Sequence, residues 1–316
     1  MSRFEFIKCH GSGNDFILVD ITNDEALQRV DWSAFARVAC DRSTSIGSDG
    51  LLLVVRHEDG VYGMDMLNPD GSRAEMCGNG IRCVARYAME RGYISARSVL
   101  RSGGRDYAVA AAGEIAEGVP MYGVDIAIRL WSKDFAFFAE GEEWLGKSVE
   151  ALSSELQFSA LSLGNPHLVA KVEQISLAEL EALGERVKVL PNIVPNGVNV
   201  SLYERRSNRS IFVATYERGA GITLSCGTAM TASATAAALL GYVERGERIE
   251  VSNRGGKVYC TTRIEGSEII TRLEGNATFE WRGEVNFVDG KVEYRVVEES
   301  GEADLWQRAV EVWGSL

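Results

Sequence analysis

The feature that most constrains the fold is a pair of segments of equal length, each of which begins with a cysteine. One runs from Cys77 to Gly92 and the other from Cys226 to Gly241, so each glycine follows its cysteine by 15 residues. Glycine readily takes the left-handed conformation that ends many helices. The pattern predicts two matched helices, each with a cysteine at its N-terminus.

A cysteine at a helix N-terminus lies beside unpaired backbone N–H groups and the positive end of the helix dipole. Both favour the thiolate, so we expect the pKa of the Cys77 and Cys226 thiols to fall towards neutrality. One such cysteine could be accidental. Two in matched settings indicate a pair of acid–base groups that arose by duplication.

Residues upstream of the cysteines extend the duplication. Three pairs keep similar distances to the two cysteines: Asn14 and Asn165 (63 and 61 residues upstream), Asp49 and Asn199 (28 and 27), and Asn68 and Glu217 (9 each). The two halves are therefore offset by about 150 residues, which is too long for a solenoid repeat. This offset predicts two homologous domains that face each other across a cleft.

Strand-like runs dominate the remaining sequence, and helical patterns are fewer. The expected strands are 4–9, 16–21, 50–55, 62–67, 122–130, 161–172, 198–203, 210–217, 248–253, 257–264, 268–275 and 277–285. The expected helices are 32–41, the two segments after the cysteines, 148–156, 176–187 and an amphipathic helix near the C-terminus, after a hairpin. Strand-rich halves with one central helix each predict α+β domains. We expect an N-terminal domain over residues 1–130 that a strand from about 276–286 completes, a second domain over 131–285 and an extension over 286–316.

Composition excludes several classes of protein. The net charge of −12 argues against nucleic-acid binding, which needs a basic face. The sequence has neither a Rossmann fingerprint nor a P-loop. It also lacks an apolar run that could span a bilayer and a signal peptide, so we expect a cytoplasmic protein with reduced cysteines and no membrane partner.

Five motifs carry a resemblance to a known family. They are KCHGSGNDFILVD (8–20), LNPDGSRAEMCGNGIRC (67–83), LGNPHLV (163–169), GVNVSLY (197–203) and YERGAGITLSCGT (216–228). In this order and at this spacing the sequence resembles the diaminopimelate epimerases, over roughly residues 3 to 285. The resemblance implies two similar domains, each a curled, barrel-like mixed sheet around a central helix, with the active site in the cleft between them.

The resemblance also implies a reaction without a cofactor or a metal. One α-carbon of LL-2,6-diaminopimelate is inverted to give the meso form, for lysine and peptidoglycan synthesis. Most amino-acid racemases use pyridoxal phosphate to stabilise the carbanion. Without that cofactor, inversion needs a base on one face of the carbon and an acid on the other, and Cys77 and Cys226 supply them as thiolate and thiol. We favour Cys77 as the base for the LL isomer.

The family's other functional positions map onto this sequence by its motifs. The resemblance assigns the binding of the substrate, and particularly of its distal end, to Asn14, Asn68, Asn165, Asn199 and Arg218. It assigns the carboxylate at the reacting carbon to the backbone N–H groups of Gly78, Asn79, Gly227 and Thr228, and it places His167 and Glu217 beside the reacting centre. Relatives are commonly dimers, so we expect a homodimer.

Simpler structural roles compete with some of these assignments. Lone cysteines are most often small buried apolar residues, which is our expectation for Cys9, Cys40, Cys83 and Cys260. Asparagines beside glycines are ordinary turn residues, although a turn does not exclude a ligand contact. His167 could be a buried structural histidine, and we expect only structural or surface roles for His10 and His57.

Five positions depart from the family pattern. Ser43 and Thr44 stand where relatives commonly have a histidine, Gly50 where many have a glutamine, Ile222 where a glutamate is usual and Ala229 where glycine is common. These changes leave open a cofactor-independent racemase or epimerase of another amino acid and, less readily, a non-catalytic amino-acid-binding protein. The sequence leaves two roles open for the tail after residue 286. One is to cap a domain, and the other is to extend a dimer interface.

Overall fold

The computed structural model describes residues 2–190 and 192–314, and the chain forms two compact units. Unit 1 comprises the residues up to 124 and those from 274 onward, and unit 2 comprises residues 125–273. The chain passes between the units twice, within strand β8 (Val119–Ile128) and within strand β17 (Glu268–Asn276). The observed limits, after residues 124 and 273, differ from the expected limits at residues 130 and 285. Strands β8 and β17 run unbroken across the observed limits, so no linker marks them.

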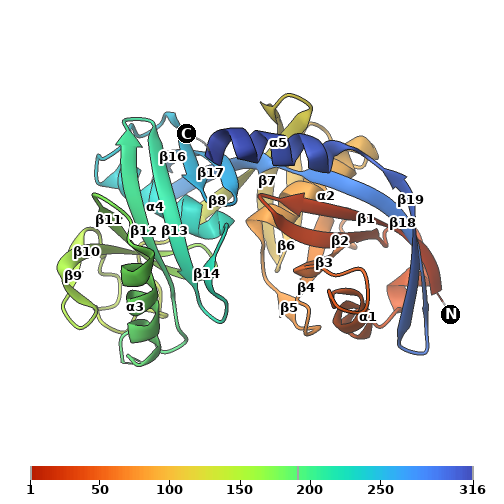
Figure 1. The fold of residues 1–316 in the computed structure, drawn as a ribbon, viewed down its shortest axis with the longest axis horizontal. Coiled ribbons are helices and arrows are strands. Elements are labelled where there is room, and N and C mark those ends of the chain that lie inside the picture. Colours follow the sequence, from red (N-terminus) through yellow and green to blue (C-terminus); the bar gives the residue numbers. More distant parts are fainter. Residues whose placement is uncertain (1, 191, 315–316) are drawn as a thin grey trace. The chain divides into compact units, whose positions relative to one another are not determined.

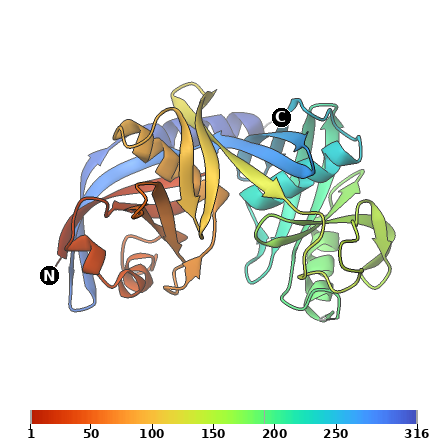
Figure 2. The same cartoon turned by 180° about the vertical axis from the view of Figure 1, so that it is seen from behind.

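Unit 1 is a mixed sheet that runs in the order β19-β18-β1-β2-β3-β4-β6-β7-β8, with the short β5 beside β4. Its further strands are β1 (Ser2–Gly11), β2 (Asn14–Asp20), β3 (Gly50–Arg56), β4 (Tyr62–Leu67), β5 (Arg73–Ala74), β6 (Arg97–Ser102), β7 (Arg105–Ala116), β18 (Thr278–Val288) and β19 (Lys291–Glu299). The pairs β2–β3 and β4–β6 are parallel, and the others are antiparallel. Figure 2 shows β6 and β7 as long gold and yellow strands in front.

Helix α2 (Gly78–Glu90) is the centre of unit 1 (Figure 1). It packs against β1, β2, β3, β4, β6 and β7, and its residues from Gly78 to Ala88 are buried. Gly80 allows the close packing, since a Cβ there would lie 2.8 Å from Leu52 Cδ2. On another part of the sheet, helix α1 (Trp32–Ala39) inserts Trp32 and Phe35 into a core with Phe4, and Asp31 caps its N-terminus.

Unit 2 repeats this topology. Its strands are β9 (Lys147–Val149), β10 (Ser153–Ser162), β11 (Pro166–Val172), β12 (Asn199–Ser207), β13 (Ser210–Glu217), β14 (Gly221–Thr223), β15 (Arg248–Asn253) and β16 (Gly256–Glu265). They run in the order β9-β10-β11-β12-β13-β15-β16, with β14 beside β13 and the pairs β11–β12 and β13–β15 parallel. The parallel pairs, the short extra strand and the helix after it occupy the same places as in unit 1.

Helix α4 (Gly227–Leu239) is the buried centre of unit 2 and packs against β10, β11, β12, β13, β15 and β16. Its sequence is almost entirely Ala, Thr, Ser and Met, so it is narrow enough to be surrounded. The expected helix over 176–187 is α3 (Leu177–Lys188), which packs on the sheet with Ser176 as its N-cap. The prediction of α+β units with a mixed sheet around a central helix is confirmed for each unit.

The glycines expected to end the central helices do so. Gly92 and Gly241 have φ of 70° and 74°, which is the left-handed conformation. The helix expected over 148–156 is wrong, because that segment forms β9 and the start of β10. Its apolar residues Val149 and Leu152 instead contribute to the core of unit 2.

The tail belongs to unit 1. Strand β19 forms the expected hairpin with β18, which turns at Asp289 and Gly290, and helix α5 (Glu302–Gly314) follows it. In the side chain of Glu302, each carboxylate oxygen accepts a hydrogen bond from Arg86 of α2, at 2.5 and 2.6 Å. The Trp306 ring lies 5.5 Å from the His10 ring, so the tail is anchored on both the central helix and β1.

Candidate active site

Cys77 is the N-cap residue of α2. Its backbone is extended (φ −135°, ψ 116°), and the N–H groups of Asn79 and Gly80 point to its sulfur. Its Sγ lies 3.7 Å from Oδ1 of Asn14, which accepts a hydrogen bond from the thiol. Asn14 comes from the start of β2, so unit 1 places this residue beside Cys77, a contact that the sequence did not predict.

Cys226 has the same position in α4, with φ −133° and ψ 107°. Its sulfur lies 3.5 Å from the hydroxyl of Thr228, which in turn accepts a hydrogen bond from Nδ2 of Asn165 at 3.3 Å. Asn165 directly precedes β11, as Asn14 begins β2. Each unit thus places a thiol at a helix N-terminus beside an asparagine from the corresponding strand.

The expected fall in the thiol pKa values is wrong. Burial raises the pKa of Cys77 and Cys226, and this effect exceeds the opposing effect of the backbone N–H groups. At Cys226 the negative charge of Glu217 raises the pKa further, whereas the Thr228 hydroxyl lowers it. Both thiols are therefore expected to be protonated at neutral pH.

Glu217 ends strand β13, and Arg218 follows it directly. Oε1 of Glu217 accepts a hydrogen bond from the Thr223 hydroxyl at 2.6 Å, across the β13–β14 pair. The backbone N–H of Arg218 donates to Oδ1 of the buried Asn199 at 3.0 Å, and its Nη1 donates to the backbone oxygen of Asn196 at 3.2 Å. Unit 2 therefore places Glu217, Arg218 and Asn199 close together.

His167 is fully buried next to these residues on β11. Burial and the positive charge of Arg218 lower its pKa to about 3, so the ring is neutral. Its Nε2 lies 3.1 Å from Oδ1 of Asn165, while its Nδ1 has no hydrogen-bond partner among the described residues. Since Oδ1 can only accept, the proton is on Nε2 and the Nδ1 lone pair is free.

Asn68 occupies the turn between β4 and β5. Its side chain donates to the hydroxyl of Ser72 at 2.9 Å, and its backbone oxygen accepts from the N–H of Gly71. The turn role that competed with ligand binding is thus present. No residue that the structure describes donates a hydrogen bond to the amide oxygen of Asn68.

Sequence reasoning missed a buried arginine in α2. Arg82 is 0% exposed and donates to the backbone oxygens of Gly78 and Asn276, to Oδ1 of Asn79 and to the Ser12 hydroxyl. It fixes the first turn of α2 against the loop before Asn14, and its positive charge lowers the pKa of Cys77. The available signal was a charged residue one turn into a helix predicted to be central.

The departures from the family pattern have local structural reasons. A Cβ at Gly50 would lie 2.9 Å from the backbone oxygen of Leu67, so no side chain fits there without a shift. Ser43 and Thr44 donate to Asp41 in an exposed turn. Two further departures are apolar: Ile222 packs against the core of unit 2, and Ala229 is buried in α4.

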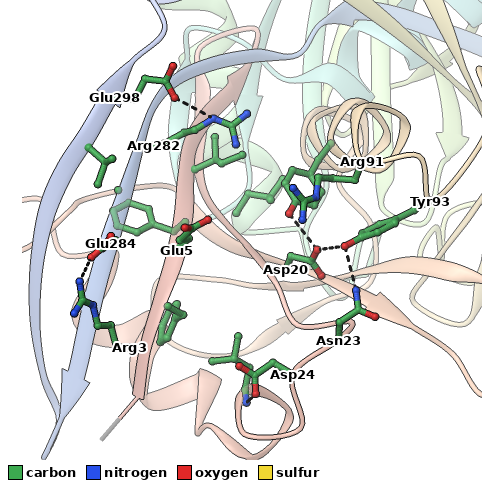
Figure 3. Close-up of a pocket in the computed structure, with 18 residues that line it drawn as sticks. Arg3, Glu5, Asp20, Asn23, Asp24, Arg91, Tyr93, Arg282, Glu284 and Glu298 are labelled. Carbon is green, nitrogen blue, oxygen red and sulfur yellow. Dashed lines mark hydrogen bonds and ion pairs between the residues drawn. The ribbon is translucent and has the colours of Figure 1, made fainter.

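A cavity of about 480 Å³ in unit 1 lies away from Cys77 (Figure 3). It adjoins the C-terminal end of α2, where the Asp20 carboxylate accepts hydrogen bonds from the hydroxyls of Tyr87 and Tyr93. Arg3 and Glu284 form an ion pair on its opposite wall. None of the residues expected in the active site lines this cavity.

The described residues contain no group of three or more His, Cys, Asp or Glu side chains that could hold a metal ion. None of their helices is long and apolar enough to cross a membrane.

Comparison with known proteins agrees with this geometry. A family model described as diaminopimelate epimerase matches residues 6–121 and 159–280. The diaminopimelate epimerase of Clostridium acetobutylicum is 37% identical over 302 residues, covering 94% of this chain and 90% of the relative. That of Listeria innocua is also 37% identical, covering 98% of this chain and 97% of the relative.

Solved structures share the fold at low identity. A Bacillus anthracis phenazine biosynthesis protein of the PhzF family aligns with a TM-score of 0.63 and 18% identity, covering 91% of this chain and all of the other. A hydroxyproline epimerase from Agrobacterium vitis aligns with a TM-score of 0.58 and 13% identity, covering 98% of each chain. The near full-length similarity of sequence, with the two cysteines inside the matched regions, decides the family. This chain belongs to the diaminopimelate epimerase family.

Proposed function

We propose that this protein inverts one α-carbon of LL-2,6-diaminopimelate to give meso-diaminopimelate, in the synthesis of lysine and peptidoglycan precursors. One observation carries the proposal. In a chain of this family, Cys77 and Cys226 each cap the buried central helix of topologically matched units. Binding alone would need no such pair of thiols, whereas inversion needs an acid and a base.

The proposed mechanism uses one thiol on each face of the reacting carbon. A thiolate removes the α-proton and the other cysteine, as a thiol, delivers a proton to the opposite face. Because the roles exchange with the direction of reaction, the two thiols titrate as a coupled pair. This scheme requires both thiols to act on the same α-carbon of one substrate molecule.

The helix N-termini supply the electrostatic part of the mechanism. The backbone N–H groups of Gly78, Asn79, Gly227 and Thr228 bind the substrate carboxylate, where enolate-like charge develops as the proton leaves. A protein that stabilises this charge with fixed dipoles needs no carbanion-stabilising cofactor. We therefore propose that no cofactor or metal takes part.

The raised pKa values of the thiols affect how strong a base each thiolate is and which cysteine ionises more readily. A thiolate formed in a site that disfavours ionisation has a high proton affinity, which suits the removal of a weakly acidic α-proton. Glu217 raises the pKa of Cys226 beyond the effect of burial and has no counterpart at Cys77, where the corresponding residue is Asn68. Cys77 therefore ionises more readily than Cys226. We propose Cys77 as the base for the LL isomer.

Diaminopimelate carries a second amino-acid group that the site must hold. Asn14, Asn68, Asn165, Asn199 and Arg218 are proposed to bind the substrate, chiefly this distal end, and His167 and Glu217 to act beside the reacting carbon. The guanidinium of Arg218 suits a carboxylate, since it offers paired donors. The neutral His167 accepts through Nδ1, which suits an ammonium group.

We further propose that the enzyme is a cytoplasmic homodimer. Light scattering after size exclusion gives the mass of the assembly directly, and a mass of about 34.5 kDa, that of one chain, would contradict the dimer.

The deciding experiment is proton NMR of LL-diaminopimelate with the reduced protein in deuterated water, without pyridoxal phosphate. We expect loss of the α-proton signal together with formation of the meso isomer. Catalytically inactive Cys77→Ala protein is the control for buffer exchange. No exchange by a folded protein with free thiols would contradict the proposal, and exchange with another amino acid in competition would reassign its substrate.

A further inference from the structure

The side-chain amide of Asn14 faces Cys77, and its orientation matters for the chemistry of the thiol. An amide oxygen accepts a hydrogen bond and so stabilises the protonated thiol, whereas an amide NH₂ donates and would stabilise the thiolate. A free asparagine could present either side. Something must select the orientation if the proton affinity of Cys77 is to be well defined.

The oxygen side of the amide is directed to the N-terminus of α2. Oδ1 of Asn14 lies 3.7 Å from Sγ of Cys77 and 3.2 Å from Nδ2 of Asn79. Asn79 is itself oriented, because its own Oδ1 accepts from the buried Arg82. Two donors therefore point at the Asn14 oxygen.

The nitrogen side is held by Asp49. Nδ2 of Asn14 donates to Oδ2 of Asp49 at 2.7 Å, and the same oxygen accepts from the backbone N–H of Asp15 at 3.2 Å. A carboxylate can only accept, so it cannot pair with the oxygen side of the amide. Asp49 is fixed in turn by its backbone N–H, which donates to the backbone oxygen of Asp15 at 2.9 Å, and by Arg42, whose guanidinium donates to Oδ1 at 2.7 Å.

The surrounding charges complete the setting of Cys77. From α2, Arg82 lowers its pKa and the Cys83 thiol raises it. Behind Asn14 the carboxylates of Asp49 and Asp15 meet Arg42, and Lys8 pairs with Asp15. A change at Asp49 therefore alters both a charge and a hydrogen bond, and a test must separate the two.

Unit 2 has no equivalent arrangement. Asn199 stands at the position that corresponds to Asp49, and its Oδ1 accepts from the backbone of Arg218. Asn165 corresponds to Asn14, but its amide contacts His167 and Thr228 and leaves Cys226 to the hydroxyl of Thr228. Of the two cysteines, only Cys77 faces an asparagine amide that is oriented by a carboxylate.

We propose that Asp49 is a positioning residue for Cys77: it fixes the Asn14 amide with its oxygen towards the sulfur and so favours the protonated thiol. The importance of this for catalysis rests on the proposed function, since a thiolate with a high proton affinity is the stronger base towards an α-proton. The orientation itself does not depend on the substrate and is testable without it.

The experiment measures the rate of Cys77 alkylation by iodoacetamide against pH, in a Cys226→Ser background. Peptide mass spectrometry identifies the modified cysteine. Asp49→Leu removes the charge and the acceptor. Asp49→Asn also removes the charge and the Oδ1 acceptor of Arg42, but it keeps an oxygen at the Oδ2 position, where the Asn14 amide and the Asp15 N–H both donate. The difference between these variants isolates the hydrogen bond.

We expect the Cys77 pKa in Asp49→Leu to fall below that in Asp49→Asn by about half a pH unit or more, or about threefold in thiolate fraction below the pKa, because the freed amide turns its NH₂ to the thiolate. In an Asn14→Leu background the two Asp49 variants should no longer differ, since the amide that transmits the effect is absent. Equal Cys77 pKa values in Asp49→Leu and Asp49→Asn, with Asn14 unchanged, would overturn the proposal. A difference between these two variants that persists in the Asn14→Leu background would also overturn it.

Two precautions keep the result interpretable. Circular dichroism and thermal unfolding verify the fold of each variant, and Asp49→Ala removes the same acceptor with less volume if leucine prevents folding. Failure of the unmutated protein to epimerise diaminopimelate would refute the proposed function and leave the alkylation result intact. If the unmutated protein epimerises diaminopimelate but the Asp49 variants show the same pH profile of Cys77 alkylation as each other, only the role of Asp49 is refuted.

Discussion

Cys77 and Cys226 have the same backbone position and different chemical surroundings. Cys77 is partly exposed and faces an amide oxygen, whereas Cys226 is 8% exposed and lies beside a hydroxyl and a carboxylate. Duplication supplied two similar helix starts, and the residues around them then diverged. A two-base enzyme benefits from this asymmetry, because the substrate and product differ in which face carries the proton.

The two-base scheme makes a sharp prediction for single substitutions. We expect Cys77→Ala and Cys226→Ala each to lower the rate of inversion at least about 100-fold, since either change leaves only one acid–base group. The measurement is kcat for formation of the meso isomer. Substantial inversion by either variant would refute the scheme, whereas Cys260→Ala, a buried cysteine elsewhere in unit 2, should keep its activity.

Two buried histidines predict a pH dependence of stability. Burial lowers the pKa of His167 to about 3 and that of His10 to about 4, below the value of about 6.5 in an unfolded chain. Below pH 6.5 the unfolded state binds protons that the native state does not, so stability is complete above this pH and falls as pH decreases towards 4. At pH 5 the loss is about 2 kcal/mol for each histidine.

Urea unfolding at pH 7.5, 6 and 5 measures this loss. His167→Gln should be less stable at pH 7.5 but should have a shallower pH dependence between 7.5 and 5. A variant with the slope of the original protein would show that His167 is not buried in its neutral form.

At the scale of elements, the central helices connect the site to the rest of each unit. Helix α2 carries Cys77 at one end and Arg86 near the other, and Arg86 binds Glu302 at the start of α5. The guanidinium of Arg86 also lies 3.9 Å from the centre of the Phe279 ring and donates to the backbone oxygen of Ala277. The tail therefore stabilises the helix that carries Cys77 at its N-terminus.

Removing the charge of Glu302 tests this anchoring. Arg86 and Glu302 have side chains that are only 9% and 17% exposed, so we expect Glu302→Gln to lower the free energy of unfolding by roughly 2–4 kcal/mol. Glu298→Gln is the matched control, because Glu298 pairs with Arg282 at 3.8 Å on an exposed surface, and its loss should cost at most about 1 kcal/mol. Equal effects of the two changes would contradict a structural role for the tail.

The elements themselves were predictable to different degrees. The expected central helices formed with their glycine caps, since periodicity and end signals agreed. The hairpin of β6 and β7 was missed, because its pattern of Ala, Gly and charged residues lacks the β-branched runs typical of strands. The helix expected over 148–156 was wrong, because pairing of β9 with β10 overrode local helical preference.

At the scale of the whole molecule, the proposed function needs both units for one reaction. Each unit has its own core and its own thiol, and neither thiol alone can invert a carbon by this mechanism. Substrate binding should therefore change the reactivity of both Cys77 and Cys226.

Protection from alkylation measures that coupling. We expect saturating diaminopimelate to slow iodoacetamide modification of both Cys77 and Cys226, as quantified by peptide mass spectrometry, and to stabilise the fold by about 2.7 kcal/mol at 100 times its Kd. An amino acid that does not bind, tested at the same concentration, is the control. Protection of only one cysteine would contradict a shared site.

The sequence by itself determined the duplication, the two thiols, the family and most of the strands. These follow from local signals: the spacing of motifs, apolar periodicity and glycines where the chain must turn. Tertiary structure alone decided the chemical state of the site. The thiol pKa values rose because burial outweighs the helix N-terminus, and burial is a property of the surrounding sheet. The pairing of Asn14 with Asp49, 35 residues apart, likewise appeared only when parallel strands β2 and β3 brought them together.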